Sequence, residues 1–210
     1  MAVEFDAVVL AGGRSRRLGG VDKAALVGPD GRSALGRAVA ACRGAGRMAV
    51  VGDQAGRLLP WPGVLWTREE PPFGGPARGI AAGLAVLGEA GPPWVLVLAC
   101  DLPEAAAGVA RLVAVAAAGV EAGSSVVGVT PDGRPQWLLG LYDRAALVTA
   151  CAQLPGGGSG ESVRGLVGAL PLQWVTLPFA AAADLDTWTS VRALGFQRPQ
   201  ARQRKESVHG

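Results

Sequence analysis

Histidine is almost absent from this sequence. The single example, His209, lies in a polar C-terminal segment that is expected to be disordered. Its position argues against Ser-His-Asp and Cys-His catalysis, against histidine as a general base and against histidine-ligated zinc. Any chemistry in the rest of the chain must therefore use carboxylates, cations, backbone amides or a metal held by oxygen.

Cysteine is also scarce. Cys42, Cys100 and Cys151 are odd in number and form no C-x-x-C pair, which argues against a disulfide framework and a zinc ribbon. No apolar run approaches the roughly 18 residues needed to span a bilayer, and the opening segment MAVEFD lacks the apolar core of a signal peptide. We therefore expect a cytoplasmic protein that has no membrane partner.

The excess of positive charge is small and local. The formal net charge of the 210 residues is +3, and the basic residues concentrate within residues 10–26 and after residue 196. There is no stripe of Lys and Arg interleaved with aromatic residues, so we expect no nucleic-acid partner. Residues 1–196 are predicted to form a single domain, and residues 197–210 a disordered basic tail.

Strand-like and helix-like segments alternate along the chain. Short apolar runs predict strands, and apolar residues at three- or four-residue spacing predict helices. The predicted strands are 5–11, 47–52, 63–67, 92–101, 124–129, 136–141 and 172–177. The predicted helices are 33–46, 77–91, 103–119, 143–153, 161–168 and 186–195. This order predicts a three-layer α/β/α fold with a mostly parallel, doubly wound, Rossmann-like sheet.

The first predicted strand runs into a loop rich in glycine and in cations, LAGGRSRRLGGVDKAAL (residues 10–26). In a doubly wound sheet, ligands bind at the carboxyl ends of the strands, beside this turn. Gly12 and Gly13 permit close backbone approach, and exposed amides with Arg and Lys side chains hold phosphate oxygens. The loop matches neither the Walker pattern nor G-x-G-x-x-G. It predicts an anion site, with a solvated basic turn as the alternative.

A lone carboxylate, Asp101, follows the most apolar predicted strand in the segment LVLACDLP. This position lies at the same edge of the sheet as the loop. A carboxylate there is costly unless it binds a cation or is well hydrogen-bonded, and Mg²⁺ prefers one or two carboxylates together with phosphate oxygens. Asp101 is therefore a candidate magnesium ligand. The alternative is a helix N-cap, because the next predicted helix begins at Pro103.

Four further segments stand out in order along the chain: REEPPFGGPARGIAAGL (68–84), CDLP (100–103), RPQWLLGLY (134–142) and DLDT (184–187). Together with the loop of residues 10–26, they resemble the molybdenum cofactor guanylyltransferases of the nucleotidyltransferase superfamily. The loop is similar to the signature L-A-G-G-x-S-x-R-M-G-x-D-K of that family. It differs in having Leu18 in place of methionine and one additional residue at Gly19-Gly20.

The resemblance implies roles for the matching residues. The guanine and the phosphates would be held by the backbone of Leu10, Ala11, Gly12 and Gly13. Arg17 and Lys23 would neutralise the triphosphate and stabilise charge on the α-phosphate. Asp101 would hold Mg²⁺ and contact the nucleotide, and Asp186 is a weaker candidate for the same metal. Glu70 stands where the family has an aspartate that helps to hold the nucleoside.

The resemblance also implies the reaction and its partners. Gln136, Ser162 and Arg164 fall where the family builds its pterin pocket, with ordinary polar residues beside a strand and a helix as the alternative. The implied reaction transfers GMP from GTP to molybdenum-molybdopterin and releases pyrophosphate. Further partners would be molybdenum-insertion proteins and the molybdoenzymes that accept the cofactor. A phosphate monoester is already ionised near neutral pH, so this reaction needs no general base. Such a reaction is compatible with a chain that has almost no histidine.

Two alternatives stay open at this point. One is a cytidylyltransferase for the same cofactor, or another nucleotidyltransferase that acts on a sugar or small-molecule phosphate. The segments LAGG and DK favour the guanylyl branch, because the cytidylyl branch tends to have LAAG and no aspartate before the lysine. The other alternative is a non-catalytic nucleotide-binding protein, against which the presence of Lys23 and Asp101 argues.

Overall fold

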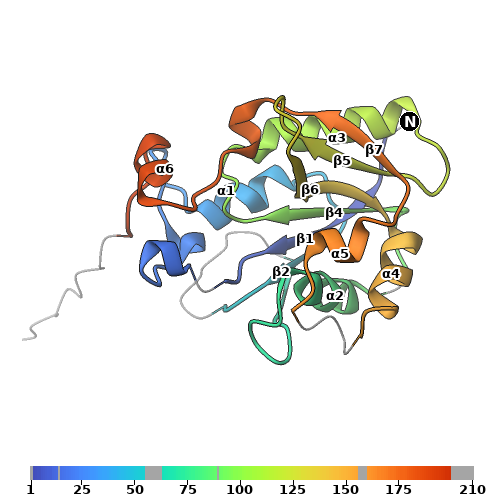
Figure 1. Ribbon diagram of the computed structural model, residues 1–210, viewed down its shortest axis with the longest axis horizontal. Helices are drawn as coiled ribbons and strands as arrows, with labels where there is room; N and C mark the ends of the chain where they lie inside the picture. The colour runs from blue at the N-terminus through green and yellow to red at the C-terminus, as the bar shows by residue number, and fades with distance from the viewer. Residues whose placement is uncertain (1, 14, 55–62, 89, 156–159, 200–210) are drawn as a thin grey trace, which may run out of the picture.

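The computed structural model describes residues 2–13, 15–54, 63–88, 90–155 and 160–199, which form a seven-stranded sheet with helices on both faces (Figure 1). The strands are β1 (Phe5–Leu10), β2 (Met48–Val51), β3 (Val64–Thr67), β4 (Trp94–Ala99), β5 (Ser125–Val129), β6 (Pro135–Asp143) and β7 (Leu172–Thr176). The α-helices are α1 (Ala34–Ala41), α2 (Pro76–Leu87), α3 (Ala105–Ala118), α4 (Arg144–Ala152), α5 (Val163–Val167) and α6 (Trp188–Ala193). Short 3-10 helices are η1 (Arg16–Leu18), η2 (Lys23–Ala25) and η4 (Phe179–Ala182). Every strand and helix predicted from the sequence is therefore present, most of them with shorter ends.

The strand order is β3-β2-β1-β4-β6-β5-β7. The pairs β1–β2, β1–β4, β2–β3 and β5–β7 are parallel, whereas β6 is antiparallel to both of its neighbours. A tight hairpin causes this reversal: the Thr130 amide donates to the Arg134 carbonyl at 3.0 Å, and Gly133 takes a φ of +84°. The prediction of a mostly parallel, doubly wound sheet is confirmed, with β6 as its antiparallel strand.

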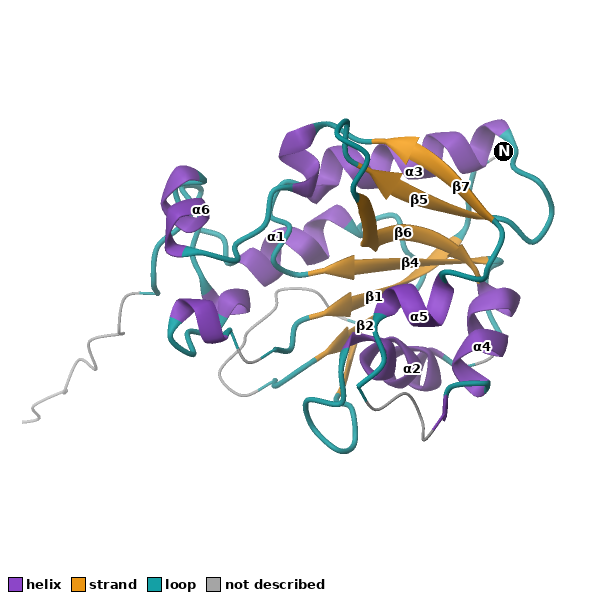
Figure 2. Ribbon diagram, in the orientation of Figure 1, coloured by secondary structure: helices purple, strands orange, loops and turns teal. Residues whose placement is uncertain are grey.

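Alternate residues of the buried strands pack into two separate cores. Ala7 and Val9 of β1 face the core beneath α1, α3 and η4, whereas Val8 faces the core beneath α2, α4 and α5. Because successive side chains of a strand point to opposite faces, both layers of helices are anchored on the same central strands. Figure 2 shows these helices on either side of the sheet. Within the described residues, no helix is long and apolar enough to cross a membrane.

A third, smaller apolar cluster lies beyond the carboxyl ends of the strands. It joins Leu18 and Leu26 of the glycine-rich loop to Leu185, Val191 and Phe196 of the C-terminal segment. The same two segments lie side by side in Figure 1, where α6 stands next to the blue part of the chain. Gln197, which was predicted to begin a disordered tail, instead exchanges two backbone hydrogen bonds of 2.9 Å with Val27. Residues 200–210 of the predicted tail, with His209, lie outside the described residues.

Candidate active site

A cavity of about 580 Å³ opens at the carboxyl edge of the sheet, next to β1 and β4. Its lining includes eight of the residues predicted to bind the nucleotide or the metal: Leu10, Ala11, Gly12, Gly13, Arg17, Lys23, Asp101 and Asp186. They come from three parts of the chain, namely the glycine-rich loop, the end of β4 and the segment before α6. The predicted anion site and the predicted metal ligands therefore share one cavity, as expected for parallel strands whose carboxyl ends meet at one edge.

Residues 19–25 of the glycine-rich loop are held by a turn and a cap. Gly19 and Gly20 take φ values of +69° and +79°, a backbone conformation that favours glycine. The Asp22 carboxylate then accepts the Ala24 amide at 3.1 Å and caps η2. This cap fixes Lys23 at the first position of η2. The sequence alone indicates no role for Asp22, whereas in the structure its cap orients the lysine that follows it.

Lys23 joins the two candidate metal ligands. Its ammonium group donates to Asp101 Oδ2 at 2.9 Å and also to Asp186 Oδ1. Arg17 Nη1 donates to the other oxygen of Asp186 at 3.2 Å. The side chains of Lys23 and Asp101 are 18% and 23% exposed, whereas Arg17 is 76% exposed. The Lys23–Asp101 pair is thus the least solvated ion pair of the cavity, and Arg17 contributes charge from its rim.

The alternative that Asp101 caps a helix is wrong. The helix that follows, α3, begins at Ala105, and its N-cap residue is Glu104, which makes no side-chain capping bond. The carboxylate of Asp101 is instead directed to Lys23 in the cavity. Burial and a cation partner therefore explain this aspartate better than helix capping does.

The charged side chains of the cavity shift the pKa values of their neighbours. Burial alone would lower the pKa of the Lys23 ammonium, but the carboxylates of Asp101 and Asp186 outweigh it and raise that pKa. Partial burial raises the pKa of the Asp184 carboxyl, and the charges of Asp186 and Asp101 raise it further. Lys23 is therefore a cation at neutral pH, and the negative charge beside it favours a bound cation.

The two carboxylates are suitable ligands for Mg²⁺. Because one ammonium group hydrogen-bonds to both Asp101 and Asp186, their oxygens lie close enough to reach a single ion. Among the described residues, there is no group of three or more His, Cys, Asp or Glu side chains that could hold a metal. The remaining ligands would come from water and from substrate phosphates, which is the usual arrangement for Mg²⁺ at nucleotide sites.

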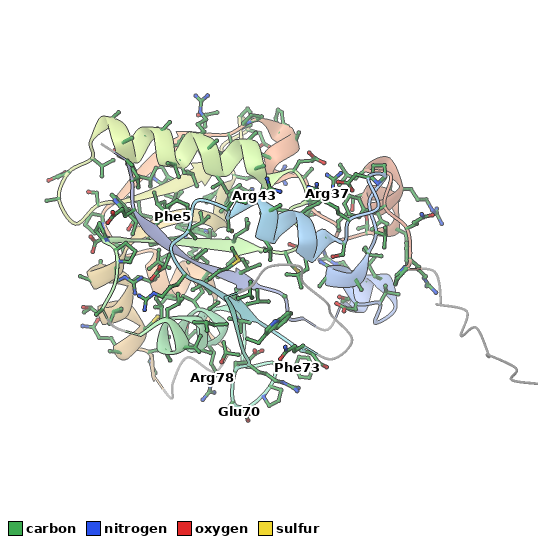
Figure 3. The ribbon with its side chains drawn as sticks, turned by 180° about the vertical axis from the view of Figure 1, so that it is seen from behind. Phe5, Arg37, Arg43, Glu70, Phe73 and Arg78 are labelled. Atoms are coloured by element: carbon green, nitrogen blue, oxygen red, sulfur yellow. The ribbon has the colours of Figure 1, made fainter. Side chains whose placement is uncertain are left out.

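Glu70 does not line the cavity. It is exposed in the loop between β3 and α2, and Figure 3 shows it at the outer end of that loop. The preceding residue, Glu69, lines the cavity and accepts the Phe73 amide at 3.1 Å. Glu69 could not be distinguished from Glu70 in the sequence, because the conformation of the loop decides which of the two side chains faces the cavity. No periodicity extends across the prolines that follow to indicate it.

The three residues predicted for a pterin pocket also lie outside the cavity lining. Ser162 is the N-cap of α5, and its hydroxyl oxygen accepts the Gly165 amide at 3.0 Å, which supports its alternative as an ordinary polar residue. Arg164 is exposed on α5. Gln136 is half-buried near the start of β6. Because β6 is antiparallel to β4, this start lies at the same sheet edge as the cavity.

Comparisons with known proteins give the family and the fold of the chain. The family model of the MobA-like NTP transferase domain matches residues 7–171. Among curated proteins, none matches the chain in sequence.

Several solved structures share its fold. Rv0371c from Mycobacterium tuberculosis H37Rv is 23% identical, with a TM-score of 0.69 over 92% of this chain and 98% of that one. Molybdopterin-guanine dinucleotide biosynthesis protein A from Archaeoglobus fulgidus is 18% identical, with a TM-score of 0.66 over 90% and 96%. The 2-C-methyl-D-erythritol 4-phosphate cytidylyltransferase of Thermus thermophilus is 21% identical, with a TM-score of 0.64 over 93% and 98%. At these identities, the structural similarity establishes the fold alone.

Proposed function

The chain belongs to the family of the MobA-like NTP transferase domain, and from this premise we propose that it transfers GMP from GTP to molybdenum-molybdopterin and releases pyrophosphate. Membership of this family supports a nucleotidyltransferase activity. The guanine base and the molybdopterin acceptor are our proposal. The observation that carries it is the shared cavity, in which the LAGG backbone lies beside Lys23 and Asp101. The signature of residues 10–26 favours GTP over the other nucleotides.

The residues of the cavity suit a reaction that needs charge stabilisation rather than proton transfer. The attacking phosphate monoester is ionised near neutral pH, so catalysis reduces to aligning it with the α-phosphate and neutralising the charge that develops. Gly12 and Gly13 would hold the triphosphate against the loop backbone, and Lys23 and Arg17 would supply positive charge to it. Mg²⁺ held by Asp101 and Asp186 would supply Lewis-acid stabilisation of the phosphate oxygens.

A cytidylyltransferase is the second candidate, because the Thermus thermophilus enzyme with the shared fold is named as one. Thermal unfolding with Mg²⁺ and GTP, CTP, ATP or UTP in turn distinguishes the two. A ligand that binds only the folded state at 100 times its Kd stabilises it by about 2.7 kcal/mol. We expect the largest rise in Tm with GTP. A larger rise with CTP would contradict the guanylyl assignment.

Replacing Lys23 by alanine is expected to lower kcat by about 10²- to 10³-fold, the usual loss for a preorganised group that stabilises developing charge. The measurement is pyrophosphate release with saturating GTP, Mg²⁺ and molybdenum-molybdopterin. Arg111→Ala is the control, because Arg111 is exposed on α3 and does not line the cavity. A Lys23→Ala variant with the kcat of the native protein would remove Lys23 from the mechanism.

A further inference from the structure

The lining of the cavity changes from charged to apolar across the sheet edge. On the β4 side, Lys23 is bonded to Asp101 and Asp186. On the β2 side, the lining is largely apolar, with Leu10, Val51, Phe73, Pro76 and Gly79, and the carboxylate of Glu69 lies beside Phe73. This side is closely packed, since a Cβ atom at Gly79 would lie 3.2 Å from Leu10 and 3.7 Å from Val51. One side of the cavity therefore suits phosphates and a metal, and the other suits a flat apolar group.

Phe73 is the aromatic residue of the apolar side, and it stands out in two respects. Its side chain is 55% exposed, as those of Trp174 and Phe179 also are in large part, but of these three only Phe73 lines the cavity. Its backbone has a φ of +65°, a conformation that is unfavourable for a bulky residue. Such conformations concentrate at ligand-binding sites, where the surrounding structure maintains them. The fold therefore holds an exposed aromatic ring at the cavity instead of burying it.

The loop that carries Phe73 is fixed at both ends. The backbone amide of Phe73 donates to Glu69 Oε1 at 3.1 Å, and this hydrogen bond closes a turn before α2. On the other side, the Gly74 carbonyl accepts the Gly160 amide at 2.7 Å, so the loop is also tied to the segment before α5. Figure 3 shows Phe73 and Glu70 in this loop, next to Arg78 of α2. A ring held by such a loop is preorganised, so ordering it costs little on binding.

We propose that Phe73 is the stacking surface for the base of the nucleoside triphosphate. The inference rests on the proposed function, because it takes the charged side of the cavity as the place of the phosphates. The base and the α-phosphate are joined through the ribose, so the base reaches the neighbouring apolar side. A heteroaromatic base stacks on an aromatic ring with a gain that depends little on its identity. Phe73 thus supplies affinity for a nucleotide as distinct from a bare polyphosphate.

The test uses isothermal titration calorimetry with two probes, GTP and inorganic triphosphate, each in the presence of Mg²⁺. Phe73→Gly deletes the ring while glycine keeps the positive φ without strain, so the loop need not change. This variant is expected to bind GTP about tenfold more weakly and inorganic triphosphate as tightly as the native protein does. Phe73→Trp is expected to retain the affinity for GTP. The matched control is Phe179→Ala, because Phe179 is 58% exposed but does not line the cavity.

Three outcomes would overturn the stacking role. The first is native-like affinity of Phe73→Gly for GTP. The second is an equal loss for GTP and for inorganic triphosphate, which would make the residue a support of the loop. The third is unchanged GTP affinity with a raised KM for molybdenum-molybdopterin, which would place the ring against the acceptor. A native protein that binds inorganic triphosphate but no nucleotide would contradict the proposed function itself, so the two failures are distinguishable.

Discussion

Replacing Asp101 by asparagine is expected to lower kcat for pyrophosphate release at least about 1,000-fold, which corresponds to about 4 kcal/mol of transition-state stabilisation. Asparagine has nearly the same size but carries no charge, so it is a weak ligand for Mg²⁺ and a weak partner for Lys23. A metal ion contributes several kcal/mol to the transition state of phosphoryl chemistry. The effect on kcat is therefore expected to exceed that of any other single substitution in the cavity.

The fold should tolerate this substitution. Asp101 is partly exposed, and Lys23 keeps Asp186 as a partner, so the free energy of unfolding is expected to change by no more than about 1 kcal/mol. Asp30→Asn is the control for kcat, because the Asp30 carboxylate pairs with Arg37 outside the cavity lining. Near-native, Mg²⁺-dependent turnover of Asp101→Asn would remove Asp101 from the metal site.

The largest loss of stability is expected at Asp6, which is 1% exposed near the amino end of β1. This is the end of the strand opposite to the cavity. Asp6 Oδ1 accepts the Arg47 amide at 2.9 Å, and Oδ2 accepts Arg47 Nη2 at 2.8 Å and also Arg144 Nη2. Arg144 is 5% exposed and donates further to the carbonyls of Pro92 and Gly88. One carboxylate thus pairs with two guanidinium groups. It ties β1 to the connections before β2 and β4 and to the first residue of α4.

Asp6→Ala is expected to lower the free energy of unfolding by about 3–5 kcal/mol, because it leaves the buried Arg144 charge without its partner. Urea denaturation followed by circular dichroism measures this change. The double variant Asp6→Ala/Arg144→Met should recover part of the loss, since it removes the orphaned charge. Asp132→Ala is the control: its pair with Arg134 is exposed, and this substitution is expected to leave the free energy of unfolding nearly unchanged. A loss of under 1 kcal/mol in Asp6→Ala would contradict a structural role for the network.

The elements of the fold could be predicted because their signal is local. The apolar run of β4 and the helical spacing in α2 are present in the sequence itself, and the structure confirms both. The reversal of β6 was not predicted, although the segment TPDGR (130–134) carries its signal. A connection this short can form a hairpin but cannot return a strand in parallel. The turn residues, read together with the length of the connection, would have given the direction of β6.

The candidate site could be predicted only in part, because its residues meet through tertiary packing. Lys23 and Asp101 were placed at one edge by the rule that parallel strands end together, and they are hydrogen-bonded at 2.9 Å. Asp186 was known only from the resemblance. It reaches the cavity because Leu185 is fully buried and its amide donates to the Asp101 carbonyl at 3.1 Å. The strained conformation of Phe73 likewise has no signature in the sequence, since it depends on how the loop closes.

Turnover tests the proposed function most directly. The protein is incubated with Mg²⁺, molybdenum-molybdopterin and one nucleoside triphosphate at a time, and both the pyrophosphate and the dinucleotide cofactor are quantified. With GTP, we expect one pyrophosphate for each guanine dinucleotide formed, and far less of either product with CTP, ATP or UTP. Formation of the cytosine dinucleotide in place of the guanine form, or tight GTP binding with no pyrophosphate released, would contradict a guanylyl transfer.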